Sequence, residues 1–198
     1  MIQKIFNRGI FNNFRISDSL LNEARIQTKS FSSGGKIASQ TTVFLSHKHS
    51  DLNDLKGLIG WLKQEYNVEV YIDSIDPGMP SKTCGETAER IKNIINLSDR
   101  FILLATNDAI ESKWCNWELG YGDAKKFDKK IAIFPMNEAF ATDSSYKGNE
   151  YLEIYPHISY YGDGYYYNSG EKIIPGYYVV VTNNGINTLT PLSTWLRK

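Results

Sequence analysis

Between residues 41 and 135, short apolar runs alternate with segments whose apolar residues recur at helical spacing. The apolar runs lie at residues 42–45, 68–72, 101–105 and 131–134, and Pro135 closes the last of them. Runs of this length are typical of strands, and the continuous run at 101–105 is typical of a strand buried on both faces. Strands separated by helices form βαβ units, so the pattern predicts an α/β domain with a parallel sheet and helices on both faces.

The ends of the helices are marked by capping residues. Ser50 or Asp51 is expected to cap a helix after the first strand, because its apolar residues follow at helical spacing. Ser112 is expected to cap a later helix that ends near Lys125 and Lys126, where basic side chains favour a helix C-terminus. Together these helices supply the connections that a parallel sheet needs.

The chain divides into three zones. Residues 1–40 are expected to be an N-terminal extension, with a short helix over residues 17–25 and a linker rich in Ser, Gly and Lys after it. That helix would place Leu20, Leu21 and Ala24 on one side. Residues 41–135 form the core domain. Residues 136–198 form a Tyr/Gly-rich extension that we expect to pack on the core, with a strand at 177–181 and a closing helix from Pro191.

Composition limits the classes of partner. Lys plus Arg and Asp plus Glu each total 22, so the formal net charge is zero and nothing favours nucleic acid or an anionic membrane surface as a partner. No apolar run approaches the roughly 20 residues that span a bilayer. The N-terminus lacks the apolar core of a signal peptide, and the two cysteines do not form a zinc-binding pattern. We expect a cytoplasmic protein without a metal.

A parallel sheet binds ligands at the carboxyl ends of its strands. This rule selects three loops, at residues 46–51, 73–83 and 106–112. The candidate binding residues in and beside these loops are Ser46, His47, Asp51, Asp73 and Ser112. Ordinary loop and helix capping is the competing interpretation for the polar side chains of the first loop.

Three segments resemble Toll/interleukin-1 receptor (TIR) domains. Residues 43–47, followed by Ser50 and Asp51, resemble the first strand and first loop of that family, and residues 73–81 resemble its long second loop. Residues 112–119 resemble its Ser-x-Trp-x-x-x-Glu segment. The three matches occur in the family's order and spacing across about half of the chain. The resemblance implies a flavodoxin-like fold for the core.

The resemblance also implies two kinds of function. Many bacterial and plant TIR domains cleave NAD+ at the nicotinamide–ribose bond, and many animal ones are self-associating signalling adaptors. Bacterial members commonly act in antiphage defence, some by making a signal derived from ADP-ribose. The family's catalytic Glu corresponds to Glu118 and its Trp to Trp114. NAD+ would then be a substrate and not a cofactor, the chain would form a homo-oligomer through TIR–TIR contacts, and a downstream effector would sense the nucleotide product.

The chemistry is compatible with a single carboxylate. Nicotinamide leaves NAD+ as a neutral molecule, so its departure needs no general acid, unlike an ordinary glycoside leaving group. Positive charge develops on the ribose, where Glu118 can stabilise it. Trp114 lies four residues before Glu118 and therefore shares its helix face, where it can stack beside a ring of the substrate. The helix N-terminus near Ser112 favours a phosphate.

Several alternatives remain open at this stage. Glu118 can be a solvated carboxylate at a helix start, and Trp114 and Trp117 can be core residues. Cys115 lies near a helix N-terminus, but no base partner for a nucleophile is evident. The chain can also be a TIR interaction module without catalysis, or a related fold that acts on nucleosides, such as a deoxyribosyl transferase.

Overall fold

The computed structural model describes residues 1–24, 40–72 and 85–197. The predicted loop over residues 73–82, including the candidate Asp73, lies outside the described residues. In the described part, nine strands form one sheet in the order β4-β3-β5-β6-β7-β8-β9, with β1 beside β7 and β2 beside β6. The strands are β1 Ile2–Gln3, β2 Phe6–Asn7, β3 Thr42–Ser46, β4 Glu69–Ile72, β5 Arg100–Ala105, β6 Ile131–Asn137, β7 His157–Tyr161, β8 Gly176–Asn183 and β9 Ile186–Pro191.

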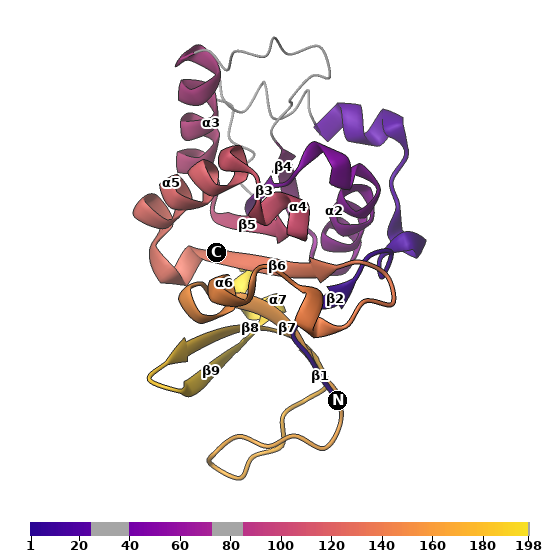
Figure 1. Ribbon diagram of the computed structural model, residues 1–198, viewed down its shortest axis with the longest axis vertical. Helices are drawn as coiled ribbons and strands as arrows, with labels where there is room; N and C mark the ends of the chain where they lie inside the picture. The colour runs from indigo at the N-terminus through magenta and orange to yellow at the C-terminus, as the bar shows by residue number, and fades with distance from the viewer. Residues whose placement is uncertain (25–39, 73–84, 198) are drawn as a thin grey trace.

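The sheet is parallel where the βαβ pattern predicts it. Strands β4, β3, β5, β6 and β7 run parallel to one another, which confirms the expected α/β fold. Beyond β7 the direction alternates, because β8 and β9 continue the same sheet as antiparallel strands. The strand predicted at 177–181 is the middle of β8. Figure 1 shows β8 and β9 projecting at the opposite end of the molecule from α3.

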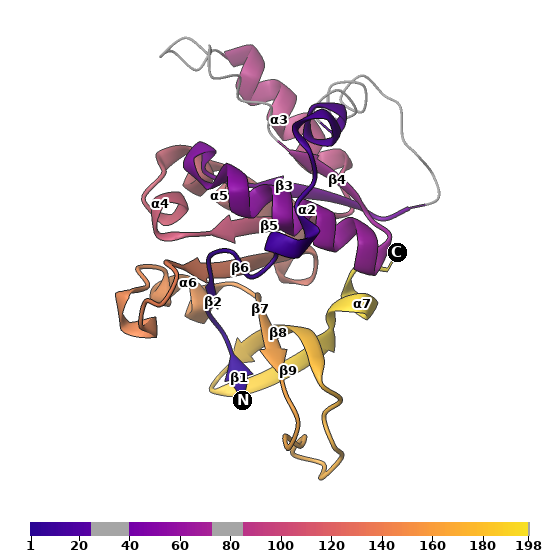
Figure 2. The ribbon, with the colours of Figure 1, turned by 90° about the vertical axis from the view of Figure 1, so that its right-hand side faces the viewer.

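Helices cover both faces of the sheet. The α-helices are α2 Leu52–Tyr66, α3 Gly85–Leu97, α4 Asn107–Ile110, α5 Lys113–Lys130, α6 Asn149–Ile154 and α7 Leu192–Trp195, and the 3-10 helices are η1 Asn12–Phe14, η2 His49–Asp51 and η3 Asp143–Ser145. Helices α2 and α7 pack with one face of the strands in one hydrophobic core, and α3, α4 and α5 pack with the other face in a second core. Figure 2 shows α2 lying along the sheet.

The observed helix and strand ends differ from two expectations. Helix α5 continues to Lys130 and does not end near Lys125. Its last turn still carries two lysines, so the favourable charge at the C-terminus is kept one turn further on. Strand β6 runs through Pro135 to Asn137.

Proline is tolerated inside β6 because of where it lies. The N–H of Ile133 donates to the carbonyl of Pro156 at 2.8 Å, so it points towards β7. The nitrogen of Pro135, two residues on, faces the same side of the strand. On that side, β6 pairs with β7 at Ile133 and with β2 from Met136 onwards, so Pro135 lies between the two pairings. The missing N–H therefore removes no hydrogen bond of the sheet.

The first 16 residues are part of the folded core. Phe6 and Phe11 have exposed fractions of 0% and 4%, and both belong to the core cluster formed by α2 and the sheet. Figure 2 shows this segment passing from β1 to lie beside α2. In the short helix that follows, only two of the three residues expected on one side are buried: Leu21 and Ala24 are each 1% exposed, whereas Leu20 is 49% exposed.

Replacing either of two helical glycines by alanine should change the stability of the fold, but in opposite directions. A Cβ added at Gly60 in α2 would lie 1.9 Å from the carbonyl oxygen of Phe14, whereas one added at Gly120 in α5 would meet no atom within 4 Å. Gly60→Ala should therefore destabilise the fold by about 1–3 kcal/mol, because helix and N-terminal segment must separate. Gly120→Ala should stabilise it by up to about 1 kcal/mol. Urea denaturation of both variants measures the difference, and equal midpoints would contradict the close packing at Gly60.

Candidate functional site

Ser46 and Glu118 meet at the carboxyl end of β3. Ser46 is the last residue of β3, and Glu118 lies in the second turn of α5. The Ser46 hydroxyl donates a hydrogen bond of 2.5 Å to Oε2 of Glu118, although 72 positions separate the two residues. Both side chains are buried, with exposed fractions of 0% and 1%. Glu118 is therefore not the solvated carboxylate of an ordinary helix start, because it lies against the sheet at the edge where parallel sheets bind ligands.

The start of α5 holds this carboxylate in place. Ser112 is the N-cap, and its side-chain oxygen accepts a hydrogen bond from the backbone N–H of Cys115 at 3.4 Å, which confirms the predicted cap. Leu119 and Cys115 are buried in the core cluster beneath α5. Burial of these two side chains orients α5 so that Glu118, the residue before Leu119, faces the end of β3.

Cys115 is a structural residue. Burial is the largest cause that raises the pKa of its thiol to about 11, and the carboxylates of Glu118 and Asp51 also raise it, whereas Ser112 and Lys48 lower it. The thiol is thus protonated at neutral pH, and a protonated thiol is a poor nucleophile.

We therefore predict that native Cys115 resists alkylation by iodoacetamide at pH 8, and that it reacts once the protein is unfolded in urea. Peptide mapping by mass spectrometry follows this residue separately from Cys84. Rapid labelling of the native thiol would show that the pKa is not raised.

Asp51 lies in a buried ionic network next to this pair. The side chain is 1% exposed, and its Oδ2 accepts a hydrogen bond of 2.6 Å from the hydroxyl of Thr106. Its Oδ1 is 2.7 Å from Nη2 of Arg8, and Nη1 of the same guanidinium is 3.0 Å from Oδ2 of Asp54. Asp51 occupies the N-cap position of α2, as expected, but its side chain makes no capping hydrogen bond.

The ionisation of Asp51 depends on this network. Burial is the largest influence and raises the pKa of Asp51, and the charge of Asp108 also raises it. The hydrogen bond from Thr106 and the hydrogen bond and charge of Arg8 lower it. A buried carboxylate without these partners would favour its neutral form.

Trp114 stands in a row of aromatic side chains along α5. Its ring stacks on Trp117 with centroids 4.8 Å apart, and Trp117 stacks on Tyr121. The ammonium of Lys92 on α3 lies 5.8 Å from the centre of the Trp117 ring. Trp114 and Trp117 both pack at the border of the core cluster. A role of Trp114 as a wall of the substrate site remains a prediction.

The other candidates stand as follows. His47 follows β3 directly, is partly exposed, and its Nδ1 is 3.4 Å from the carbonyl oxygen of Leu45. Of the three predicted loops, the first and third come together, because Ser50 donates to Asp108 at 3.0 Å in addition to the Thr106–Asp51 bond. Binding roles for Ser46, His47, Asp51, Asp73 and Ser112 remain predictions.

Arg8 was missed by the sequence interpretation. It lies in the N-terminal zone, outside every recognised motif, and its carboxylate partners Asp51, Asp54 and Glu138 are all more than 40 residues away. A weak signal existed, since Asp51 and Asp54 are three residues apart at a helix start and so share a face that attracts a cation.

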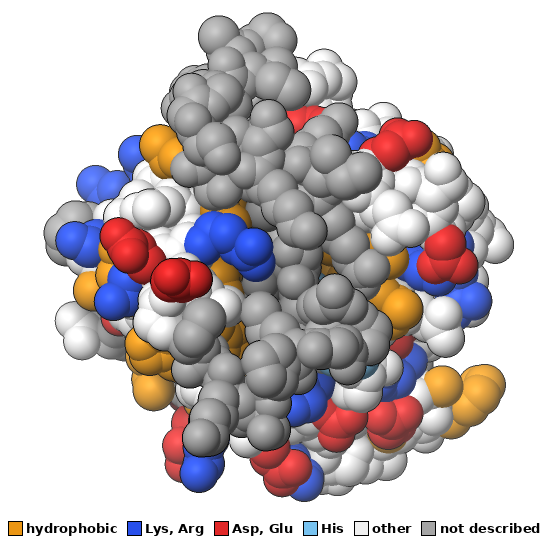
Figure 3. All heavy atoms as spheres, turned by 90° about the horizontal axis from the view of Figure 1, so that it is seen from above, with side chains coloured by type: hydrophobic (Ala, Val, Ile, Leu, Met, Phe, Trp, Pro, Cys, Tyr) orange, Lys and Arg blue, Asp and Glu red, His pale blue; other side chains and the backbone are white. Residues whose placement is uncertain are grey.

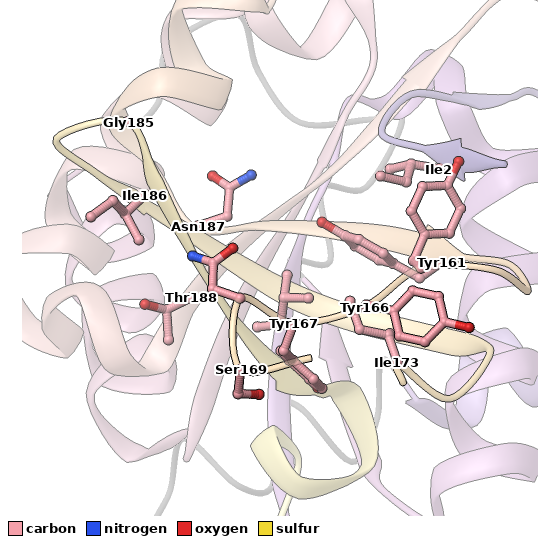
Figure 4. Close-up of a pocket in the computed structure, with 13 residues that line it drawn as sticks. Ile2, Tyr161, Tyr166, Tyr167, Ser169, Ile173, Gly185, Ile186, Asn187 and Thr188 are labelled. Atoms are coloured by element: carbon pink, nitrogen blue, oxygen red, sulfur yellow. The ribbon is translucent and has the colours of Figure 1, made fainter. Parts of the chain in front are cut away.

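A hollow bounded by described residues lies elsewhere, between the β8–β9 turn and the loop after β7 (Figure 4). Its volume is about 610 Å³, and the described residues that line it carry no charge; they include Tyr161, Tyr166, Ile173 and Asn187. The face of the molecule seen from above carries basic and acidic side chains intermixed (Figure 3). Neither feature involves Glu118.

Within the described residues 1–24, 40–72 and 85–197, no group of three His, Cys, Asp or Glu side chains comes together that could hold a metal ion. No helix there combines the length and apolar character needed to cross a membrane.

Comparison with known proteins shows the family of this chain. The family model described as TIR domain matches residues 43–156, which is more than half of the chain. Over 119 residues the chain is 32% identical to a Bacillus cereus (strain MSX-D12) protein named probable 3' cyclic ADP-D-ribose synthase ThsB'. This match covers 59% of the present chain and 60% of the relative, so the chain spans less than two thirds of the relative's length. The chain belongs to the TIR domain family.

Proposed function

We propose that this protein cleaves NAD+ at the nicotinamide–ribose bond and that Glu118 is the catalytic residue. The observation that carries the proposal is the buried contact between Glu118 and Ser46 at the carboxyl end of β3. A carboxylate removed from bulk water acts on a developing cation more strongly than one in solvent. The name of the Bacillus cereus relative, a cyclic ADP-ribose synthase, supports the same chemistry.

The reaction requires little from the protein beyond electrostatics and positioning. The bond between the ribose C1′ and the nicotinamide nitrogen breaks, and nicotinamide leaves with the electron pair as a neutral molecule. Glu118 stabilises the positive charge that grows on the ribose. A hydroxyl group then attacks C1′ and loses its proton. If that hydroxyl belongs to water the product is ADP-ribose, and if it belongs to the same nucleotide the product is cyclic.

The biological role follows from the product. We infer that a product derived from ADP-ribose is a signal for a downstream effector in bacterial antiphage defence, in a cytoplasmic setting. We also infer that TIR–TIR contacts between copies of the chain assemble the active form. The neutral net charge leaves little long-range repulsion against such association.

The test is incubation of the purified protein with NAD+, followed by mass spectrometry of all products. The protein concentration is raised stepwise and a crowding agent is added, so that an activity that needs assembly is detected. Release of nicotinamide with ADP-ribose or a cyclic isomer supports the proposal. Nucleosides tested in parallel separate it from a deoxyribosyl transferase. Absence of turnover under every condition would leave a TIR interaction module as the function.

A further inference from the structure

Arg8 joins the N-terminal segment to three carboxylates in different parts of the domain, one of which is the candidate residue Asp51. Its guanidinium pairs with Asp51 in the β3–α2 connection, with Asp54 in the first turn of α2, and through Nε with Glu138 after β6 at 2.9 Å. Its backbone N–H donates to the carbonyl of Asn137 at 2.9 Å. One side chain therefore connects the segment after β3, the first turn of α2 and the segment after β6.

The contacts on both sides make this a built arrangement. Gly9, the next residue, donates its backbone N–H to Asp54 at 2.8 Å, so the turn that presents Arg8 is itself held by α2. Opposite Arg8, the hydroxyl of Thr106 donates to the second oxygen of Asp51. Asp51 is thus held between the N-terminal segment and the end of β5, and the loop it closes begins at Ser46, the partner of Glu118.

We propose that Arg8 is a positioning residue of the candidate NAD+-cleaving site, which holds the 46–54 segment in place through its ion pairs with Asp51 and Asp54. This inference rests on the proposed function for its kinetic part. Arg8 lies outside residues 43–156, which the TIR domain family model covers. The N-terminal segment of this chain therefore completes a site whose other parts lie within the family domain.

A pH profile separates this role from simple stabilisation of the fold. Asp51 interacts with three titratable or charged groups on neighbouring segments: Arg8 after β2, Asp108 on α4 and Cys115 on α5. Arg8 in turn interacts with Asp54 on α2 and Glu138 after β6, and Cys115 with Lys48 and Glu118. Arg8 lowers the pKa of Asp51 against the effect of burial. Removing Arg8 raises that pKa, so activity that needs the ionised form is lost at a higher pH as the solution is acidified.

The experiment compares Arg8→Ala, Arg8→Lys and Arg15→Ala in the full chain. Arg15 is an exposed residue of the same segment, so its variant loses the same charge without the network. In NAD+ cleavage, Arg8→Ala should lower kcat/KM by about 10- to 100-fold, the scale of a misplaced site. In a plot of kcat/KM against pH, the acid limb of Arg8→Ala should lie at higher pH than that of the wild type. Guanidinium added at non-denaturing concentrations should restore the activity of this variant. Arg8→Lys should be intermediate, because one ammonium cannot bridge two carboxylates as a guanidinium does.

Two results would overturn the inference while leaving the proposed function intact. One is an unchanged kcat/KM and pH profile in Arg8→Ala. The other is a loss of activity that guanidinium does not restore and that shifts no limb of the profile, which would show a structural role only. If the wild-type protein cleaves no NAD+, the proposed function fails by itself. Hydrogen exchange then decides: faster exchange at residues 46–54 in Arg8→Ala, and not in Arg15→Ala, supports the positioning role, and equal exchange overturns it.

Discussion

Glu118→Gln should reduce NAD+ cleavage at least about 100-fold, the scale seen when one preorganised electrostatic group is removed from an active site. The substitution keeps the size of the side chain and an oxygen that can accept the hydrogen bond from Ser46. It removes only the negative charge that would face the ribose cation. The loss should fall on kcat more than on KM, because the charge is needed most in the transition state. Nicotinamide release at saturating NAD+ is the measurement.

A matched variant distinguishes this effect from a general loss of charge. Glu150→Gln makes the same chemical change on an exposed side chain in the first turn of α6, and it should leave cleavage unaltered. Thermal unfolding of both variants shows whether the fold is kept. Turnover that survives in a folded Glu118→Gln protein would remove Glu118 from the mechanism.

Phe6→Ala should lower the free energy of unfolding by about 3–5 kcal/mol, the range for removing a buried phenyl ring. The ring is fully buried and stacks on Phe134 of β6 with centroids 4.6 Å apart. The centre of its ring also lies 5.8 Å from the ring centre of Tyr177 in β8, so it fills space between the parallel and antiparallel parts of the sheet. Urea denaturation followed by circular dichroism measures the loss.

Phe140→Ala supplies the control, since that ring is 99% exposed. Its loss should change stability by no more than about 0.5 kcal/mol, as for most surface substitutions. If Phe6→Ala were as mild as Phe140→Ala, residues 1–16 would not be packed in the core as the structure has them.

Local sequence determined the central architecture. The alternation of apolar runs and amphipathic segments specifies strands and helices through side-chain periodicity, which neighbouring residues set by themselves. The same is true of the Ser112 cap, because a capping side chain bonds within its own turn. From these elements, the rule for parallel sheets already selected the loops in which Ser46 and Asp51 lie.

The length of an element depended on contacts that the local pattern does not contain. Helix α5 runs to Lys130 and directly into β6, although its lysines near 125 favour an earlier end. Pro135 predicts the end of a strand, yet β6 continues through it. At this position neither β7 nor β2 pairs with β6, so no strand needs a hydrogen bond from residue 135. In both cases a local end signal did not decide where the element ends.

The sequence by itself determined the type of fold and named Glu118 as the residue to test. Only the tertiary structure decided that Glu118 is buried against Ser46, and that Arg8 reaches Asp51 across more than 40 residues. The physical reason is the distance along the chain over which each interaction acts. Periodicity and capping act over one or two turns, whereas an ion pair or a buried hydrogen bond depends on which distant segments the whole fold brings together.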